Sequence, residues 1–446
     1  MRTRDGRAVP RLAESWTSTD DGLTWRFKLR TDVVFHDGSK FTGPLARESL
    51  RASLSRPGTS AMYPGLSDVV DIESPSDDEL VIRLKRRSAF LLDDLEFPIT
   101  RRVDDAVIGT GAFKTVRTSP GEVVLAAHST YYQAKPRIDE VVIRAYPTLR
   151  TAWASLMRQE IDVLSDVAHD AAEFVGSSDV AIQSFPREYV YLIAFNSARP
   201  KLSSGAVRRA LNAAVDRRKV LDSVLKGHGL AASGPLWPHH WAYDSALPAY
   251  NYEPSLANTT LDAAGLRRGG SDRGEVPARL RFVCLVPEKY SVLERLALEV
   301  QKHLYDVGVD MQLEAVSAEE YDTRIRTGNF ESAIVELVSG PVLSRAYIFW
   351  RSTAGFKGLN FFGYRNRDAD RWFDALRYAA TETEYRAAAS QLQRTLLEDP
   401  PALFLAWSER SRAISRRFEF PAEPGTDPLP QLWRWVPRSG SPAATH

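Results

Sequence analysis

Cysteine is almost missing from this chain: its 446 residues include only Cys284, which excludes an internal disulfide framework. Cys284 lies in the apolar run 280–286, so we expect a buried, inert thiol rather than a nucleophile or a metal ligand. The chain also lacks an apolar run of about 18 residues, the length that predicts a membrane span. Residues 1–7 are polar, and no apolar segment of a secretion signal follows them. Taken literally, this start indicates a cytoplasmic protein.

The chain also lacks a surplus of positive or negative residues. The 58 Lys and Arg residues nearly balance the 57 Asp and Glu residues, and the net charge is +1. A nucleic-acid-binding domain normally carries a basic surplus, so we expect no nucleic-acid partner. The length of 446 residues exceeds what one hydrophobic core usually serves and predicts two or three lobes.

Hydrophobic periodicity divides the chain into a β-rich first part and an αβ remainder. In the first part we predict a helix over 45–54 and strands over 23–29, 80–84, 123–128 and 141–146. A strand over 280–286, a helix over 291–305 and a strand over 309–316 form a predicted βαβ unit, which implies a parallel or mixed sheet. The apolar runs 402–407 and 431–436 are predicted to be closing strands.

The residue patterns that carry enzymatic chemistry are missing. We find no nucleophile elbow, no metal-ligand cluster and no Cys–His pair. His239 and His240, with His228 and Asp244 nearby, suggest a metal site, but adjacent loop histidines cannot easily point at one ion. We therefore expect these histidines to be structural or to line a cleft. No catalytic residue, metal or cofactor is predicted.

Six sequence blocks, in this order, resemble the family 5 extracellular solute-binding proteins of ABC importers for peptides, nickel complexes and related solutes. Each block is weak alone, and their order over residues 12 to 435 carries the resemblance. The blocks are 12–16 (Leu-Ala-Glu-Ser-Trp) with 20–30 and 34–38; 109–113; 131–140 with 158–163; 195–196 with 207–211 and 214–217; 234–238 with 241–244 and 252–254; and 359–364 with Asn366 and Asp370.

The resemblance implies an α/β, periplasmic-binding-protein-like clamp with two lobes, of type II and the large peptide-binder subtype. Lobe one would span 1–232, with a β-rich subdomain over about 1–107, and 421–446 would complete it; lobe two would span 233–420. A solute would bind in the cleft between the lobes, and hinge closure would bury it. The implied function is solute capture for an ABC importer rather than catalysis.

Several residues are candidates for the cleft wall. Trp241 and Trp350 lie in irregular contexts and offer aromatic faces that pack on solutes with little loss of entropy. Arg345 lies near Trp350 and can pair with an anionic ligand. Asn360 belongs to the last block and completes this group of candidates.

Two departures from the family pattern matter. Family peptide binders hold the amino terminus of the ligand with an aspartate, and Ser339 stands at that position here; Glu336 is the possible substitute. Burying an ammonium group without a counter-charge is costly, so the sequence weakens the expectation of a free-amine peptide and leaves a peptide-like or another solute open. The second departure is the start, because the 12–16 block comes so early that a truncated N-terminus is expected, with a cytosolic variant as the alternative.

The expected partners follow from the same resemblance. They are a small-molecule or peptide solute and the membrane permease of an ABC importer, and the protein itself is expected to be a monomer. The family location is periplasmic or at the cell surface. The alternative from another class is a cytosolic ligand-sensing module of a regulatory protein.

Overall fold

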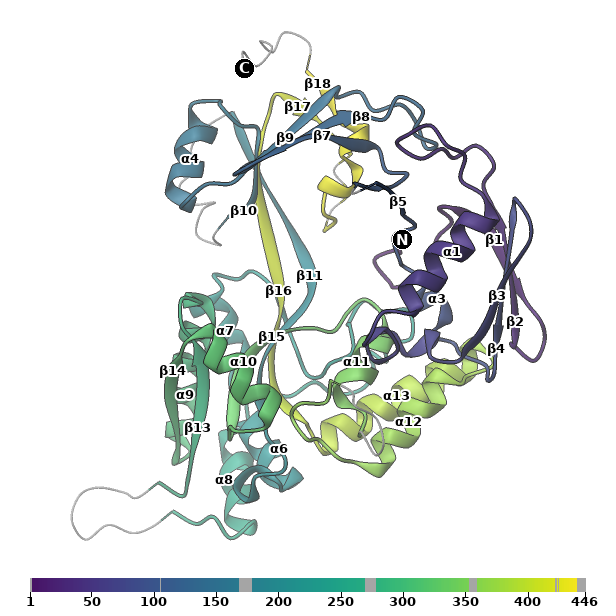
Figure 1. Cartoon of the computed structure of the whole chain (residues 1–446). Helices are drawn as coiled ribbons and strands as arrows, with labels where there is room; N and C mark the ends of the chain where they lie inside the picture. The colour runs from purple at the N-terminus through teal and green to yellow at the C-terminus, as the bar shows by residue number, and fades with distance from the viewer. Residues whose placement is uncertain are drawn as a thin grey trace.

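Two long antiparallel strands join the upper and lower parts of the molecule, as Figure 1 shows. They are β11 (Val180–Phe195) and β16 (Ala402–Ser415), which pair with each other from Val180↔Ser415 to Ala194↔Ala402. The computed structural model describes residues 2–104, 106–167, 179–268, 278–352, 359–421, 423 and 425–438. In this part of the chain no helix combines the length and the apolar character that a membrane crossing needs.

The lower part is a lobe built on most of a mixed sheet of the order β10-β16-β11-β15-β13-β14, in which β10 (Val163–Val167) belongs to the upper part (Figure 1). Strands β13 (Leu280–Pro287) and β14 (Val309–Val316) are parallel and are joined by α9 (Ser291–Asp306). This confirms the predicted βαβ unit. Cys284 is fully buried on β13, and burial raises the pKa of its thiol to about 12, as an inert core thiol requires.

One face of this sheet is covered by helices that share a single apolar core with β13 and β14. Ser204 and Asp216 cap two of these helices through hydrogen bonds to the backbone N–H groups of Val207 and Lys219. The elements on this face are η2 (Pro200–Leu202), α6 (Gly205–Ala213), α7 (Arg217–Val224), α8 (Pro254–Ala263) and α9.

The packing of α6 and α7 bears on the lobe boundary. Both helices lie in the core of the lower lobe, so the packing changes from upper to lower lobe at about residue 188, inside β11, rather than at the predicted residue 232. The short β12 (Leu230–Ala231) then pairs with β16 at Trp407 and Ala406.

The other face carries a second core beneath the helices of residues 318–398. β15 (Ser332–Val338) pairs with β11 over seven residues and brings this segment to the sheet. The helices are α10 (Ala318–Thr327), α11 (Leu343–Trp350), α12 (Arg367–Arg377) and α13 (Glu382–Glu398).

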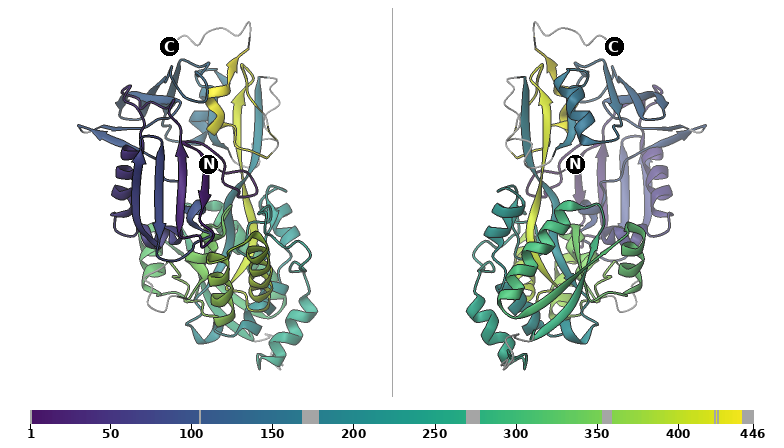
Figure 2. Two further views of the ribbon diagram at one scale, coloured as in Figure 1. Left: turned by 90° about the vertical axis from the view of Figure 1, so that its right-hand side faces the viewer. Right: turned by 90° about the vertical axis from the view of Figure 1, so that its left-hand side faces the viewer.

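The β-rich first part is a four-stranded antiparallel sheet with its own apolar core. Its strands, in sheet order, are β1 (Ala13–Ser18), β2 (Thr24–Leu29), β4 (Glu79–Leu84) and β3 (Val69–Ser76). Figure 2 shows this sheet standing above the helices of the lower lobe. The accompanying helices are α1 (Gly43–Leu54), α2 (Thr59–Met62), η1 (Pro64–Leu66) and α3 (Leu91–Asp94).

The upper part completes the molecule around the first halves of β11 and β16. It contains β5 (Arg101–Val103), β6 (Ala106–Ile108), β7 (Phe113–Ser119), β8 (Glu122–Ala127), β9 (Glu140–Arg144), α4 (Leu149–Met157), β10 (Val163–Val167), β17 (Phe418–Glu419), η3 (Leu429–Arg434) and β18 (Val436–Pro437). The predicted strand over 431–436 is wrong: prolines 428 and 430 start a 3-10 helix there, and only Val436 begins a short strand.

Candidate functional site

The candidate site is the crossing region, where β11 and β16 pass from one part of the molecule to the other. We define it as residues 186–190, 336–341 and 407–409. The register between β11 and β16 shifts between Pro186 and Val190, at the place where β15 begins to pair with β11. The irregular pairing of residues 187–189 with β16 makes this segment a natural hinge.

The end of β15 is tied to this hinge by its backbone. The N–H groups of Ser339 and Gly340 both donate to the carbonyl oxygen of Glu188, at 2.8 and 3.1 Å. The Ser339 side chain is fully buried, and its Oγ donates to the Pro235 carbonyl at 2.6 Å. The structure therefore places Ser339 in the framework of the crossing region, with its hydroxyl already bonded to protein.

Glu336, the other predicted acidic contact, is paired with an arginine of the hinge. Arg187 Nη1 lies 2.6 Å from Glu336 Oε1, and both side chains are partly exposed. The Arg187 guanidinium also covers the ring of Tyr189 at 4.2 Å. The two opposite charges therefore compensate each other.

Glu188 differs from Glu336 because its carboxylate makes no direct ion pair or hydrogen bond with the described residues. Its side chain reaches solvent, yet desolvation by the surrounding protein raises its pKa to about 7. The charge of Glu96 adds to this rise, whereas Arg345 and Arg2 oppose it. Glu188 is thus a solvent-accessible carboxylate near charged groups of three other segments, those of Glu96, Arg345 and Arg2.

Two further carboxyl groups with raised pKa values, those of Asp93 and Asp94 on α3, also lie near Arg2 and Arg345. Burial raises the pKa of Asp93 to about 7 and that of Asp94 to about 6. Arg2 Nη1 approaches Asp93 at 3.3 Å, and the Arg345 guanidinium donates to the Met62 carbonyl at 3.1 Å. The carboxyl groups of Asp93 and Asp94 and the guanidinium groups of Arg2 and Arg345 thus lie together where the β-rich sheet meets α11.

Trp241 is half-buried and stacks on Tyr385, with ring centroids 5.0 Å apart. The guanidinium groups of Arg7 and Arg386 lie 4.7 and 5.0 Å from the centroid of its indole ring. Trp241 also lines a pocket of about 240 Å³ at the junction of the β-rich sheet and α13. This pocket lies beside the crossing region, and a contact of Trp241 with a solute in the cleft stays a prediction.

Trp350 and Asn360 lie deeper than expected. Trp350 is fully buried and stacks on Phe362 at 5.3 Å, so it has no exposed face to offer a solute. Asn360 donates to the carbonyl oxygens of Arg351 and Tyr364 and accepts from the Tyr364 N–H, which fixes the turn after α11. Both residues shape the lower lobe.

The loop histidines are structural as well. Burial lowers the pKa of His240 to about 3, and its neutral Nδ1 accepts the Ala242 N–H at 3.0 Å. His228 Nδ1 lies 2.7 Å from Glu409 Oε1 on β16. The described residues hold no group of three or more His, Cys, Asp or Glu side chains that could bind a metal ion.

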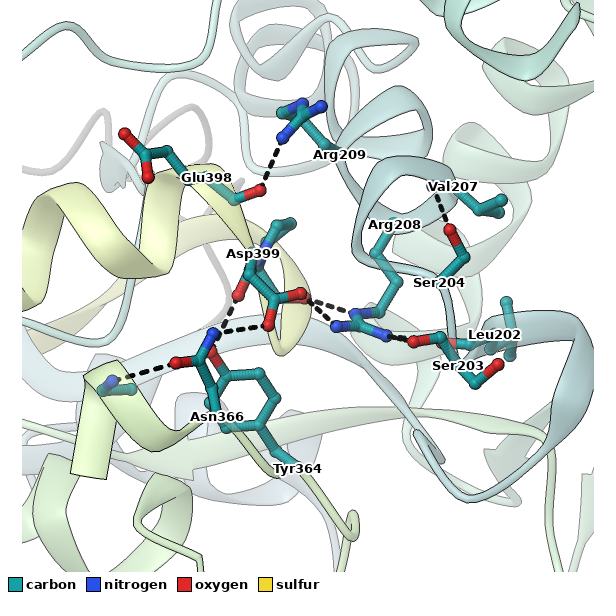
Figure 3. A network of polar contacts seen from close by, with 12 residues as sticks. Leu202, Ser203, Ser204, Val207, Arg208, Arg209, Tyr364, Asn366, Glu398 and Asp399 are labelled. Carbon is teal, nitrogen blue, oxygen red and sulfur yellow. Dashed lines mark hydrogen bonds and ion pairs between the residues drawn. The ribbon is translucent and has the colours of Figure 1, made fainter. Parts of the chain in front are cut away.

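Residues of two of the sequence blocks meet in a polar network of the lower lobe, as Figure 3 shows. Asn366 Nδ2 donates to Asp399 Oδ2 at 2.8 Å, and Arg208 donates to Asp399 Oδ1. Arg208 also donates to the carbonyl oxygens of Pro400 and Leu202, both at 2.7 Å. The network holds the end of α13 against the start of α6.

This arrangement can now be compared with known proteins. Residues 7–357 match the family described as bacterial extracellular solute-binding proteins, family 5, middle. The chain belongs to this family. The predicted resemblance and the predicted fold class are thereby confirmed, and the family consists of solute-binding proteins rather than enzymes.

Similar curated and solved proteins extend the comparison. The oligopeptide-binding protein AppA of Bacillus subtilis (strain 168) is 24% identical over 434 residues, covering 92% of this chain and 80% of AppA. The nickel-binding periplasmic protein of Escherichia coli (strain K12) is 28% identical over 349 residues, covering 73% of this chain and 66% of that protein. The structure of NikA from Brucella suis in complex with Fe(III)-EDTA has a TM-score of 0.84 at 21% identity, covering 98% and 92% of the two chains.

Sequence reasoning missed Arg187 and Glu188. Both precede the apolar run 189–195, and the signal that was available is the charged break between two β-forming stretches of one strand. Asp94 is fully buried, and the sequence did not indicate either it or its neighbour Asp93 as part of a site. Their neighbours come from segments hundreds of residues away, which periodicity cannot indicate.

Proposed function

We propose that this chain is the solute-binding component of an ABC import system and holds a peptide or another small solute between its lobes. The observation that carries the proposal is the crossing region: two continuous strands connect two bodies, and the irregular pairing lies where the bodies meet. Hinge closure about this segment is the mechanism that such a connection allows. The family to which the chain belongs supports the same function over the sensing alternative.

Charged groups from both bodies support capture of a polar solute. Glu188 makes no direct ion pair or hydrogen bond with the described residues, and Arg345 from α11 and Arg2 lie near enough to lower its pKa. We propose that Glu188, Glu336 and Arg345 contact the solute, with Trp241 at the edge. Ser339, Trp350 and Asn360 would act by holding the walls in place.

The chemical class of the solute stays between a peptide-like molecule and another charged small molecule. The names of similar proteins cover both classes, since one is an oligopeptide-binding protein and another a nickel-binding protein. Because Glu336 is engaged by Arg187, an incoming ammonium group must compete with a guanidinium for it. We therefore keep the expectation that simple peptides are not held through Glu336 alone.

The location and partners follow as proposals. We propose a periplasmic or cell-surface location, delivery of the solute to a membrane permease, and action as a monomer. A cytosolic sensing module would instead need a regulatory partner.

A thermal-shift titration tests the function. The probes are a tripeptide, its N-acetylated form and a nickel–L-histidine complex, and a binding probe raises the melting temperature with its concentration. Glu188→Gln should reduce the shift, whereas Glu319→Gln, on the exposed surface of α10, should leave it unchanged. A protein that melts cooperatively but responds to none of the probes or to a small-molecule extract would contradict solute capture.

A further inference from the structure

The β-rich sheet is fixed to the lower lobe by an interface between segments that are far apart in sequence. Phe90, which precedes α3, is fully buried within the core of the lower lobe. Its ring lies edge-on to Tyr347 of α11 and Tyr385 of α13, with centroids 5.6 and 6.5 Å apart. A side chain of one subdomain therefore completes the core of the other.

Arg377, at the end of α12, makes the densest set of polar contacts across this interface. Its Nη2 lies 2.6 Å from Asp68 Oδ2 and donates to Ser67 Oγ at 2.6 Å and to the Pro64 carbonyl at 2.8 Å. Its Nη1 donates to Tyr347 Oη at 3.0 Å, and its own carbonyl accepts the Ala89 N–H at 2.7 Å.

Both charges of this pair are buried. Arg377 is 8% exposed and Asp68 is 1% exposed. Removing one partner of a buried pair leaves the other charge uncompensated in a medium of low dielectric constant, which is strongly destabilising. The ion pair between Arg377 and Asp68 therefore favours the arrangement in which the β-rich sheet and the lower lobe are in contact. The bond between Ser344 Oγ and Asp94 Oδ1, at 3.0 Å, lies in the same interface and also joins α11 to α3.

Residues 2–8, which the antiparallel bridge between Arg2 and Ala8 closes into a small hairpin, make a second set of contacts with the lower lobe. Arg7 bonds both carboxylate oxygens of Glu382, at 2.7 and 3.2 Å, and the Trp237 indole N–H donates to the Arg4 carbonyl at 3.1 Å. Near Gly6 the backbones approach closely, because a Cβ atom there would lie 2.6 Å from the Pro341 carbonyl oxygen.

The path of the chain shows how this interface is related to the crossing strands. The β-rich sheet continues through β5 and β6 into the upper part, and the upper part reaches the lower lobe through the two crossing strands (Figure 1). The contact at Arg377 is therefore non-covalent and closes a ring whose other joints are continuous chain. Opening of a clamp at the crossing region has to break this contact or bend the ring elsewhere.

We infer that Arg377 is a positioning residue that holds the β-rich subdomain against the lower lobe and so latches the clamp shut. The inference rests on the proposed hinge function, but it concerns the latch and not the identity of the solute. In this view the β-rich subdomain holds the clamp closed from the side opposite the crossing strands.

Spin labels on two exposed helix positions, Glu48→Cys on α1 and Gln391→Cys on α13, report the separation of the two bodies without any solute. We expect one short distance in the otherwise unchanged protein. Arg377→Met should add a population at longer distance, and Arg377→Lys, which keeps the charge, should restore part of the short one. Hydrogen exchange at the Ala89 N–H should become on the order of 100-fold faster in Arg377→Met, while exchange in β13 stays unchanged.

Two further variants keep the test decisive. Asp68→Asn is nearly isosteric, removes only the counter-charge and should shift the distances in the same direction if Arg377→Met does not fold. Arg412→Met removes an equally buried arginine whose partner, Asp427, lies within the upper part, and it should leave the distances unchanged. Unaltered distances in folded Arg377→Met and Asp68→Asn would overturn the latch. Failure to find a solute would count against the proposed function alone, because these measurements contain no solute.

Discussion

At the scale of single residues, several positions of the family-like sequence blocks stabilise the fold rather than face the candidate site. Arg208 and Asn366 belong to blocks that resemble the family, yet both bond to Asp399 in the lower lobe. Gly205 packs against the same aspartate, because a Cβ atom at this position would lie only 2.3 Å from Asp399 Oδ1. Substitutions at these positions should therefore act through stability.

Arg208→Met should lower the free energy of unfolding by about 3–5 kcal/mol, because it leaves several buried carbonyl groups and Asp399 without their donor. Its neighbour Arg209 is exposed and donates only to the Glu398 carbonyl, so Arg209→Met should change stability by less than about 0.5 kcal/mol. Urea unfolding of both variants checks this pair. Equal effects would show that the network of Figure 3 is not the cause.

Asp94 should make stability depend on pH. Burial raises its pKa from 3.8 to about 6, so the folded protein takes up this proton before the unfolded chain does. Its contribution is fully present below pH 3.8 and is lost as the pH rises through about 6, a change of about 3 kcal/mol. Asp94→Asn should remove this loss, so relative to the unchanged protein it should gain stability between pH 4 and pH 7.

Unfolding of Asp94→Asn at several pH values measures this gain, with exposed Asp222→Asn as the control. A difference between Asp94→Asn and the unchanged protein that does not vary with pH would rule out the buried carboxyl as its source.

At the scale of elements, local patterns predicted regular pieces well and long strands poorly. The strand expected over 309–316 has the same bounds as β14, and the helix expected over 291–305 is α9. The strand expected over 402–407 is only half of β16, and the apolar run 189–195 is likewise only half of β11. Their other halves contain Pro186 and the polar run 408–412, which interrupt apolar periodicity. Pairing of the two strands with each other, and of β16 with β10, keeps these halves extended.

The loop before β12 offers a test at this scale. Gly229 has a φ of +118° and a Cβ atom there would lie 2.6 Å from the Trp407 carbonyl oxygen, so Gly229→Ala should detach β12 from β16 and destabilise the protein by about 1–3 kcal/mol. Gly234 has nothing within 4 Å of a Cβ atom, and Gly234→Ala should be neutral. Thermal unfolding of the two variants decides, and equal melting temperatures would contradict the proposed close approach.

At the scale of the whole molecule, the sequence predicted the clamp but not where its bodies divide. The predicted boundary at residue 232 followed the family resemblance, whereas the packing of α6 and α7 moves the division into β11. Of the predicted site residues, Glu336 lies on β15 and Ser339 directly after it, beside the crossing strands, and their contact with a solute stays a prediction. Glu188 and Asp93 owe their environment to contacts between distant segments, and no local pattern contains that information.

Native mass spectrometry of the folded protein, after incubation with the small-molecule fraction of a cell extract, tests the central claim most directly. We predict one additional species whose mass exceeds that of the free protein by one small molecule, at a ratio of one to one. Glu188→Gln should weaken that species and Glu319→Gln should not. A folded protein that takes up no small molecule, or that associates only with another macromolecule, would contradict the view that this chain is a solute clamp.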